Sequence, residues 1–116
     1  MCIRDSNNIN HWLLTDVLKT AWGFDGFVVS DLGGVGTVAA DRGTGLTVAD
    51  AVAQSLMAGC DFSDKEFQDN IPAAIRAGTL TEARLDDAVT RVMRVRMKLG
   101  EFDPFDSGPY LSLIHI

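Results

Sequence analysis

The sequence predicts an α/β fold, and only part of one. Segments with helical apolar spacing alternate with short apolar runs, and glycines stand between them. The run GFVVS at 26–30 has no polar alternation, which is typical of a parallel strand covered on both faces. One further short strand is expected at 60–62, CDF. Because two parallel strands do not make a self-sufficient sheet, the chain is interpreted as a slice of a larger α/β fold.

The first helix is predicted at about 11–22. Asn10 is a suitable N-cap and Gly23 a suitable stop. Its apolar residues recur at helical spacing: Leu13, Leu14, Val17, Leu18 and Ala21.

Two later helices carry equally clear signals. Thr47 caps a helix over 48–58 that ends at Gly59. The buried side of this helix is expected to contain Val48, Ala51, Val52, Ser55 and Leu56. The last helix is predicted at about 82–98, with a buried stripe formed by Leu85, Ala88, Val89, Val92 and Met93. Its cations favour the negative C-terminal end and are interpreted as a solvated face without a binding role: Arg91, Arg94, Arg96 and Lys98.

The segments between these helices give weaker signals. SDKE at 63–66 has the pattern of a capping box, Pro72 suits a first helical turn, and Gly78 closes that helix. Residues 32–46 contain five glycines without periodicity and predict a long loop. The glycines lack the G-x-G-x-x-G spacing and no helix is expected directly after them, so a phosphate-binding loop is rejected.

Composition excludes several classes of protein. The 116 residues are 47% apolar with a formal net charge of −6, which argues against binding nucleic acid through its phosphates. No apolar run is long enough to cross a bilayer, so no membrane partner is expected. The two cysteines, Cys2 and Cys60, are too few for a disulfide scaffold and lack metal-site spacing. Cys60 is expected to be a buried, inert thiol.

Asp31 is the residue that the strand pattern singles out. It directly follows the apolar run at 26–30 and precedes the glycine-rich segment. In parallel α/β folds, functional groups gather where strands end at their carboxyl edge. The alternative is that Asp31 caps a turn or accepts bonds from loop amides.

The motif around Asp31 resembles that of glycoside hydrolase family 3. In NHWLLTDVLKTAWGFDGFVVSDLGGV, the part WGFDGFVVSD is similar to the family's nucleophile motif, whose final Asp is Asp31. ADAVAQSLMAGCDF resembles the family's turn at the eighth strand, and AAIRAGTLTEARLDDAVTRVMRVRMKLGEFD resembles the helical segment that leaves the barrel. The resemblance covers about 7–110, with three linked motifs in order.

The resemblance implies a fold and a reaction. The chain would be the closing portion of a (β/α)8 TIM barrel, with strands 7 and 8 and their flanking helices. The complete protein would hydrolyse terminal β-D-glucosides or β-D-xylosides with retention, Asp31 acting as nucleophile and no metal or other cofactor being required. Leu32, where many members carry an aromatic residue, would form an apolar wall beside the leaving group.

Domain limits follow from the same resemblance. Residues 7–104 would be the C-terminal part of the barrel domain, and 105–110 the start of a linker to a second α/β domain. Residues 1–6 and 111–116 match nothing in the family pattern and are interpreted as non-native tails. The remainder of the barrel and the second domain, which usually supplies the acid/base Glu, would be the chain's partners besides the β-linked substrate. We therefore expect the isolated chain to be inactive.

Some residues receive structural rather than catalytic interpretations. Asp61 is expected to make a turn or helix-start hydrogen bond, Trp12 and Trp22 to pack against the barrel, and His11 to be exposed. The competing interpretation of the whole chain is a non-catalytic carbohydrate-binding or interaction remnant of the barrel. The intact Ser30–Asp31 pair argues against that alternative.

Overall fold

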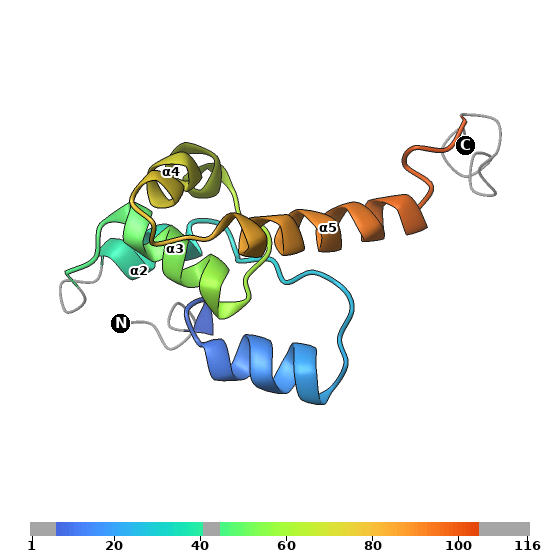
Figure 1. Ribbon diagram of the computed structural model, residues 1–116, viewed down its shortest axis with the longest axis horizontal. Helices are drawn as coiled ribbons and strands as arrows, with labels where there is room; N and C mark the ends of the chain where they lie inside the picture. The colour runs from blue at the N-terminus through green and yellow to red at the C-terminus, as the bar shows by residue number, and fades with distance from the viewer. Residues whose placement is uncertain (1–6, 41–44, 105–116) are drawn as a thin grey trace.

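A computed structural model describes residues 7–40 and 45–104 of the chain. These residues form five helices that pack around a small hydrophobic core. The proposed tails at 1–6 and 111–116 and the linker start at 105–110 lie outside these ranges. The helices are η1 (Trp12–Ala21), α2 (Gly34–Ala40), α3 (Val48–Ala58), α4 (Lys65–Arg76) and α5 (Glu82–Lys98). Helices α2, α3 and α4 cluster together, η1 lies to one side, and α5 projects away from the cluster (Figure 1). None of these helices is long and apolar enough to cross a membrane.

Helix α3 is the centre of the core. Its capping box is complete, because Thr47 Oγ1 accepts from the Asp50 amide at 3.2 Å and the Asp50 carboxylate accepts from the Thr47 amide at 3.0 Å. Gly59 ends the helix with φ +119°, a conformation that favours glycine. Helices α2 and α4 both pack on α3, which leaves Val52 and Leu56 fully buried. The predicted bounds, cap and stop of this helix are confirmed.

Helix α5 also has its predicted bounds, and Thr81 caps it by accepting from the Arg84 amide at 3.3 Å. The predicted stripe is only partly buried. Ala88 is 1% exposed, whereas Val89 is 52% exposed and borders a groove.

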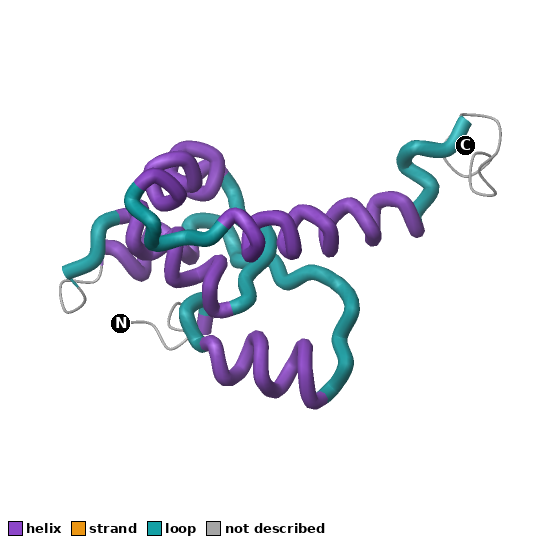
Figure 2. The backbone as a smooth tube through the Cα atoms, viewed as in Figure 1, coloured by secondary structure: helices purple, strands orange, loops and turns teal. Residues whose placement is uncertain are grey.

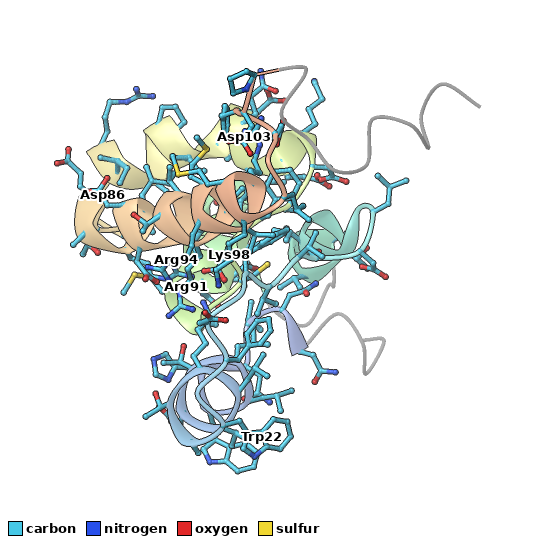
Figure 3. The ribbon with its side chains drawn as sticks, turned by 90° about the vertical axis from the view of Figure 1, so that its right-hand side faces the viewer. Trp22, Asp86, Arg91, Arg94, Lys98 and Asp103 are labelled. Carbon is cyan, nitrogen blue, oxygen red and sulfur yellow. The ribbon has the colours of Figure 1, made fainter. Side chains whose placement is uncertain are left out.

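The cations of α5 are not all a solvated face, and that interpretation is wrong for Arg91, whose side chain is 19% exposed. Arg91 Nη1 donates to the carbonyls of Phe24 and Gly26 at 3.2 and 3.1 Å. Lys98 Nζ pairs with Asp25 at 3.1 Å. Figure 3 shows Arg91 and Lys98 on the side of α5 that faces the segment leaving η1. Arg91 therefore joins residues 24–26 to α5, whereas the pair of Lys98 with Asp25 lies at the surface, with side chains 60% and 71% exposed.

Helix η1 lies where the first helix was predicted but has π-helical turns. The Trp22 amide donates to the Val17 carbonyl, five residues back, at 2.9 Å. Asn10 caps the start of the helix, as predicted, by accepting from the Leu13 amide at 3.1 Å. Gly23 follows its end with φ +68°. Leu14 is the residue of the predicted stripe that is fully buried against the core.

The two predicted strands are reduced, within the described residues, to one parallel bridge between Val29 and Phe62 (Figure 2). A strand of a parallel sheet gains its hydrogen bonds from neighbours on both edges, and here each segment has one neighbour. The outer sides stay open, so that Val29 is 57% and Phe62 50% exposed.

The prediction of a loop over 32–46 is wrong at its centre, because helix α2 begins at Gly34. The prediction that no helix begins directly after the glycines is therefore also wrong. Helix propensity in GVGTVAA is low, but Val35 and Val38 are buried against α3, and this packing outweighs the propensity. Residues 41–44 of the predicted loop lie outside the described residues.

The start of α4 differs from its prediction in two ways. The capping box at 63–66 is wrong, because Asp64 occupies the N-cap position and its side chain makes no bond to the helix. Pro72 lies inside the helix rather than in a first turn. The carbonyl that loses its N–H partner there belongs to Gln68, which is exposed and can be solvated. Gly78, with φ +71°, follows the helix end as predicted.

The described surface exposes much apolar material. A groove of about 500 Å³ runs between α4 and α5, and its apolar lining includes Phe62, Phe67, Ile71, Leu85, Val89 and Met93. Trp12 and Trp22 are 65% and 74% exposed. Monomeric soluble proteins rarely leave such patches open.

We therefore expect the 116-residue chain, expressed alone, to be molten or to aggregate. Its core is small and its apolar groove is open to water. The measurement is thermal unfolding by near-ultraviolet circular dichroism, with binding of a hydrophobic dye as a second readout. A sharp cooperative transition from a monomer that binds no dye would contradict this expectation.

Candidate active site

Two chain segments meet side by side where the predicted strands end. The Asp61 and Phe62 amides donate to the Val28 carbonyl at 2.8 and 3.1 Å, and the Ser30 amide donates to the Phe62 carbonyl at 3.0 Å. The rings of Phe27 and Phe62 meet edge to face, with centroids 6.3 Å apart. Residues 28–30 and 60–62 thus run in parallel, and the residues that follow them lie at one common edge.

Asp31 is the first residue beyond this paired segment and is exposed. Its carbonyl accepts from Ser30 Oγ at 3.0 Å and from the Gly34 amide at 3.1 Å. Its carboxylate has no hydrogen bond or ion pair with any other described residue. The alternative that this side chain caps a turn therefore has no support in residues 7–40 and 45–104.

Gly34 gives the Asp31 side chain its room. A Cβ on Gly34 would collide with Asp31 Oδ1 and would lie 2.8 Å from Asn8 Nδ2 and 2.9 Å from Ser30 Oγ. The side chains of Asp31, Asn8 and Ser30 therefore surround the position that a Cβ of residue 34 would occupy. Sequence reasoning missed Asn8 here, since nothing in its local pattern marks it.

Leu32 is 92% exposed at the same edge. It makes no contact that fixes its role among the described residues, so its assignment as a leaving-group wall stays a prediction.

The sequence suggested a turn or helix-start hydrogen bond for Asp61. The structure instead shows a buried carboxylate that forms ion pairs with two cations. Its carboxylate accepts from Lys19 Nζ at 2.7 Å, from Arg84 Nη2 at 2.6 Å and from the Val28 amide at 2.9 Å. The Asp61 side chain has no exposure at all, and those of Lys19 and Arg84 have 7% and 14%. Removal from water lowers the pKa of the Lys19 ammonium, against the opposing effect of its bond to Asp61.

The partners of Asp61 were missed by sequence reasoning. Lys19 and Arg84 lie 42 and 23 residues away along the chain. The available signal was general: a carboxylate in a buried strand requires a counter-charge. Arg84 also donates to the carbonyls of Leu56 and Cys60, at 2.6 and 3.2 Å, so it joins α5 to the end of α3.

Other predicted residues lie outside the edge that carries Asp31. Cys60 is a free, fully buried cysteine, and burial raises the pKa of its thiol, which confirms the inert interpretation. His11 is exposed, as predicted, with its Nδ1 3.6 Å from Asp16. No three acidic, histidine or cysteine side chains of the described residues come together in a metal-binding arrangement.

Comparison with known proteins connects this geometry to one family. The model of the glycosyl hydrolase family 3 N-terminal domain matches residues 5–95. The chain is 41% identical to the periplasmic beta-glucosidase of Salmonella typhimurium over 102 residues, which are 84% of this chain and 13% of that protein. It is 31% identical over 122 residues to a probable exo-1,4-beta-xylosidase of Aspergillus flavus, covering 97% of this chain and 16% of the relative.

A solved structure agrees. The beta-glucosidase of Listeria innocua superposes with a TM-score of 0.79 and 32% identity, over 94% of this chain and 16% of that one. The chain thus spans 13% and 16% of the length of the two curated relatives. The helical arrangement described above is that of one portion of much longer proteins.

These relatives supply a protein in which single residues can be tested. We consider a hybrid in which residues 7–104 replace the matched segment of the Salmonella typhimurium protein. In it, Asp61→Asn should lower the free energy of unfolding by about 3–5 kcal/mol, because the cations of Lys19 and Arg84 stay buried without their counter-charge. Calorimetric unfolding of the purified hybrid measures this.

The matched control is Asp25→Asn. Asp25 also pairs with a lysine, Lys98, but at the surface, where the two side chains are 71% and 60% exposed. This control should leave the unfolding temperature unchanged. Equal unfolding temperatures for the two variants would show that the Asp61 cluster does not hold the segment together.

Proposed function

The chain belongs to glycosyl hydrolase family 3, and on that premise we propose that the complete protein is a retaining β-glycosidase with Asp31 as its nucleophile. The observation that carries the proposal is the exposed carboxylate of Asp31, which stands at the end of a parallel paired segment and is not paired with any other residue of 7–40 and 45–104. It lies within the part of the chain that the family model matches.

The chemistry follows a double displacement. The Asp31 carboxylate attacks the anomeric carbon and forms a glycosyl-enzyme ester while a separate carboxylic acid protonates the leaving oxygen. The acid/base residue, now deprotonated, then removes a proton from the water molecule that attacks the ester and releases the sugar. Retention requires the two carboxyl groups to lie about 5–5.5 Å apart, which leaves no space for water between them. The acid/base residue is supplied by a part of the protein beyond this chain.

The environment of Asp31 suits a nucleophile, because its side chain is exposed at the end of the paired segment, where a substrate can reach it. The apolar segment behind Asp31 and its bonds to Phe62 keep its backbone in one position.

We assign residues 26–30 and 60–62 to strands 7 and 8 of a (β/α)8 barrel. The Val29–Phe62 bridge is the parallel contact that two neighbouring barrel strands would make. In the complete barrel, further strands would cover the open sides of Val29 and Phe62. The groove between α4 and α5 would be filled by the same remainder of the protein. A second α/β domain beyond the barrel is part of this proposal.

The substrate is a terminal β-linked glucoside or xyloside. The curated relatives include proteins named as a beta-glucosidase and as an exo-1,4-beta-xylosidase, which supports these two classes of substrate. Leu32, exposed beside Asp31, would offer an apolar wall to the leaving group. The second candidate, a non-catalytic carbohydrate-binding remnant, predicts no dependence on a nucleophile.

In the hybrid, Asp31→Asn should lower kcat on an aryl β-glucoside by on the order of 10³–10⁶-fold, because the amide cannot form the ester. Asp86→Asn is the matched control, since Asp86 is an exposed carboxylate on α5, away from Arg91 and Lys98 (Figure 3). Turnover is measured by release of the aryl alcohol, and folding by calorimetry. A hybrid whose Asp31→Asn variant turns over like the control has another nucleophile or none.

Gly34→Ala should lower kcat/KM roughly 10–100-fold, since the added Cβ displaces the carboxylate of Asp31 from its resting position. The unfolding temperature should hardly change, because the groups that would be displaced are the ends of flexible side chains. Gly36→Ala is the control: Gly36 lies in the same helix, and the three atoms nearest to its added Cβ all belong to the Glu66 side chain. Equal kinetics for both alanine variants would contradict the role given to Gly34.

A further inference from the structure

Asp64 accepts a hydrogen bond from a distant backbone amide rather than from its own helix. It stands at the N-cap position of α4, where an Asp side chain ordinarily accepts from an amide of its own first turn. The Asp64 side chain makes no such bond. Its Oδ2 instead accepts from the Gly33 amide at 2.9 Å, across 31 residues of sequence. The carboxylate thus joins the ends of the two paired segments rather than its own helix.

Because of this bond, the backbone is hydrogen-bonded to the segment 62–64 on both sides of Asp31. On the near side, the Ser30 amide donates to the Phe62 carbonyl at 3.0 Å. On the far side, the Gly33 amide donates to Asp64 at 2.9 Å. Only Asp31 and Leu32 stand between the two anchored residues. The segment 62–64 therefore holds the backbone of Asp31 from both directions.

The far anchor depends on a side chain and can be removed by substitution. Gly33 has φ +75°, a conformation that few residues other than glycine adopt readily, and this turn carries the chain from Asp31 into α2. Without the bond from Asp64, the turn keeps the bond from the Gly34 amide to the Asp31 carbonyl at 3.1 Å, and the Gly33 carbonyl keeps its bonds from the Thr37 amide and Thr37 Oγ1 at 3.0 and 2.9 Å. The Gly33 amide, however, loses the side-chain acceptor that joins it to the segment 62–64.

We infer that Asp64 is a positioning residue for the nucleophile: its carboxylate fixes Gly33 and thereby aims the carboxylate of Asp31. This inference rests on the proposed function of Asp31. Attack on an anomeric carbon requires aligned atoms, and a displacement of about 1 Å can cost 10²-fold in rate. Asp64 contributes geometry and forms no bond to substrate.

Three substitutions in the hybrid separate positioning from folding. Asp64→Ser removes the reach to Gly33 and places at the N-cap position of α4 a residue that is favourable there, so the start of the helix is not weakened. Asp64→Asn keeps an oxygen acceptor of the same reach and removes the charge. Asp50→Ala is the matched control, because it also deletes a carboxylate that accepts a backbone amide, that of Thr47, at the start of α3.

The principal readout is the rate at which a 2-deoxy-2-fluoro-β-glucosyl fluoride labels Asp31, followed by mass spectrometry of the peptide. Labelling reports attack by the nucleophile, independently of the later hydrolysis. We expect Asp64→Ser to slow labelling and kcat/KM about 100-fold, and Asp64→Asn to restore both to within a few-fold. Asp50→Ala should lower the unfolding temperature and leave labelling unchanged.

The outcomes distinguish the two proposals. If the label never reaches Asp31 in the unsubstituted hybrid, the proposed function fails and the inference fails with it. If Asp31 is labelled and Asp64→Ser labels as fast as Asp50→Ala, only the positioning role of Asp64 is overturned. If Asp64→Asn is as slow as Asp64→Ser, although both unfold like the parent hybrid, the charge rather than the hydrogen bond matters and the inference is likewise wrong.

Discussion

The carboxylate of Asp61 has no access to water, and the structure is arranged to satisfy it. Lys19 from η1, Arg84 from α5 and the Val28 amide supply three donors between 2.6 and 2.9 Å. Burying a charge without such partners costs several kcal/mol. The folded arrangement therefore favours bringing η1, α5 and the segment around Val28 together at Asp61. The helix at the start of the described chain and the helix near its end are thereby fixed to the same point.

The edge that carries Asp31 depends on this point. Val28 belongs to the segment that Asp61 binds, and Asp31 lies three residues further on. A charge cluster on one side of the paired segments thus holds the backbone, and the opposite end presents an unpaired carboxylate. The two aspartates have opposite environments: Asp61 is buried and fully paired, whereas Asp31 is exposed and unpaired among the described residues.

The sequence predicts what depends on local signals. Helices α3 and α5 have their predicted bounds because Thr47 and Thr81 cap them and their apolar residues repeat at helical spacing. Helix α2 was not predicted, since packing of Val35 against α3 forms it in spite of its glycines. At the site, the motif pointed to Asp31, but the partners of Asp61 come from distant parts of the chain, beyond the reach of any local pattern.

The closed set of charges around Asp61 has a consequence for evolution. Among the described residues, every donor to this carboxylate comes from the range 19–84, within one contiguous stretch of coding sequence. A recombination event that exchanged the stretch between two relatives would carry the counter-charges together with the charge they neutralise. A crossover inside it, between Asp61 and Arg84, would recombine donors and acceptor from different parents. Where the two parents differ at Lys19, Asp61 or Arg84, such a junction would leave a buried charge without its partner.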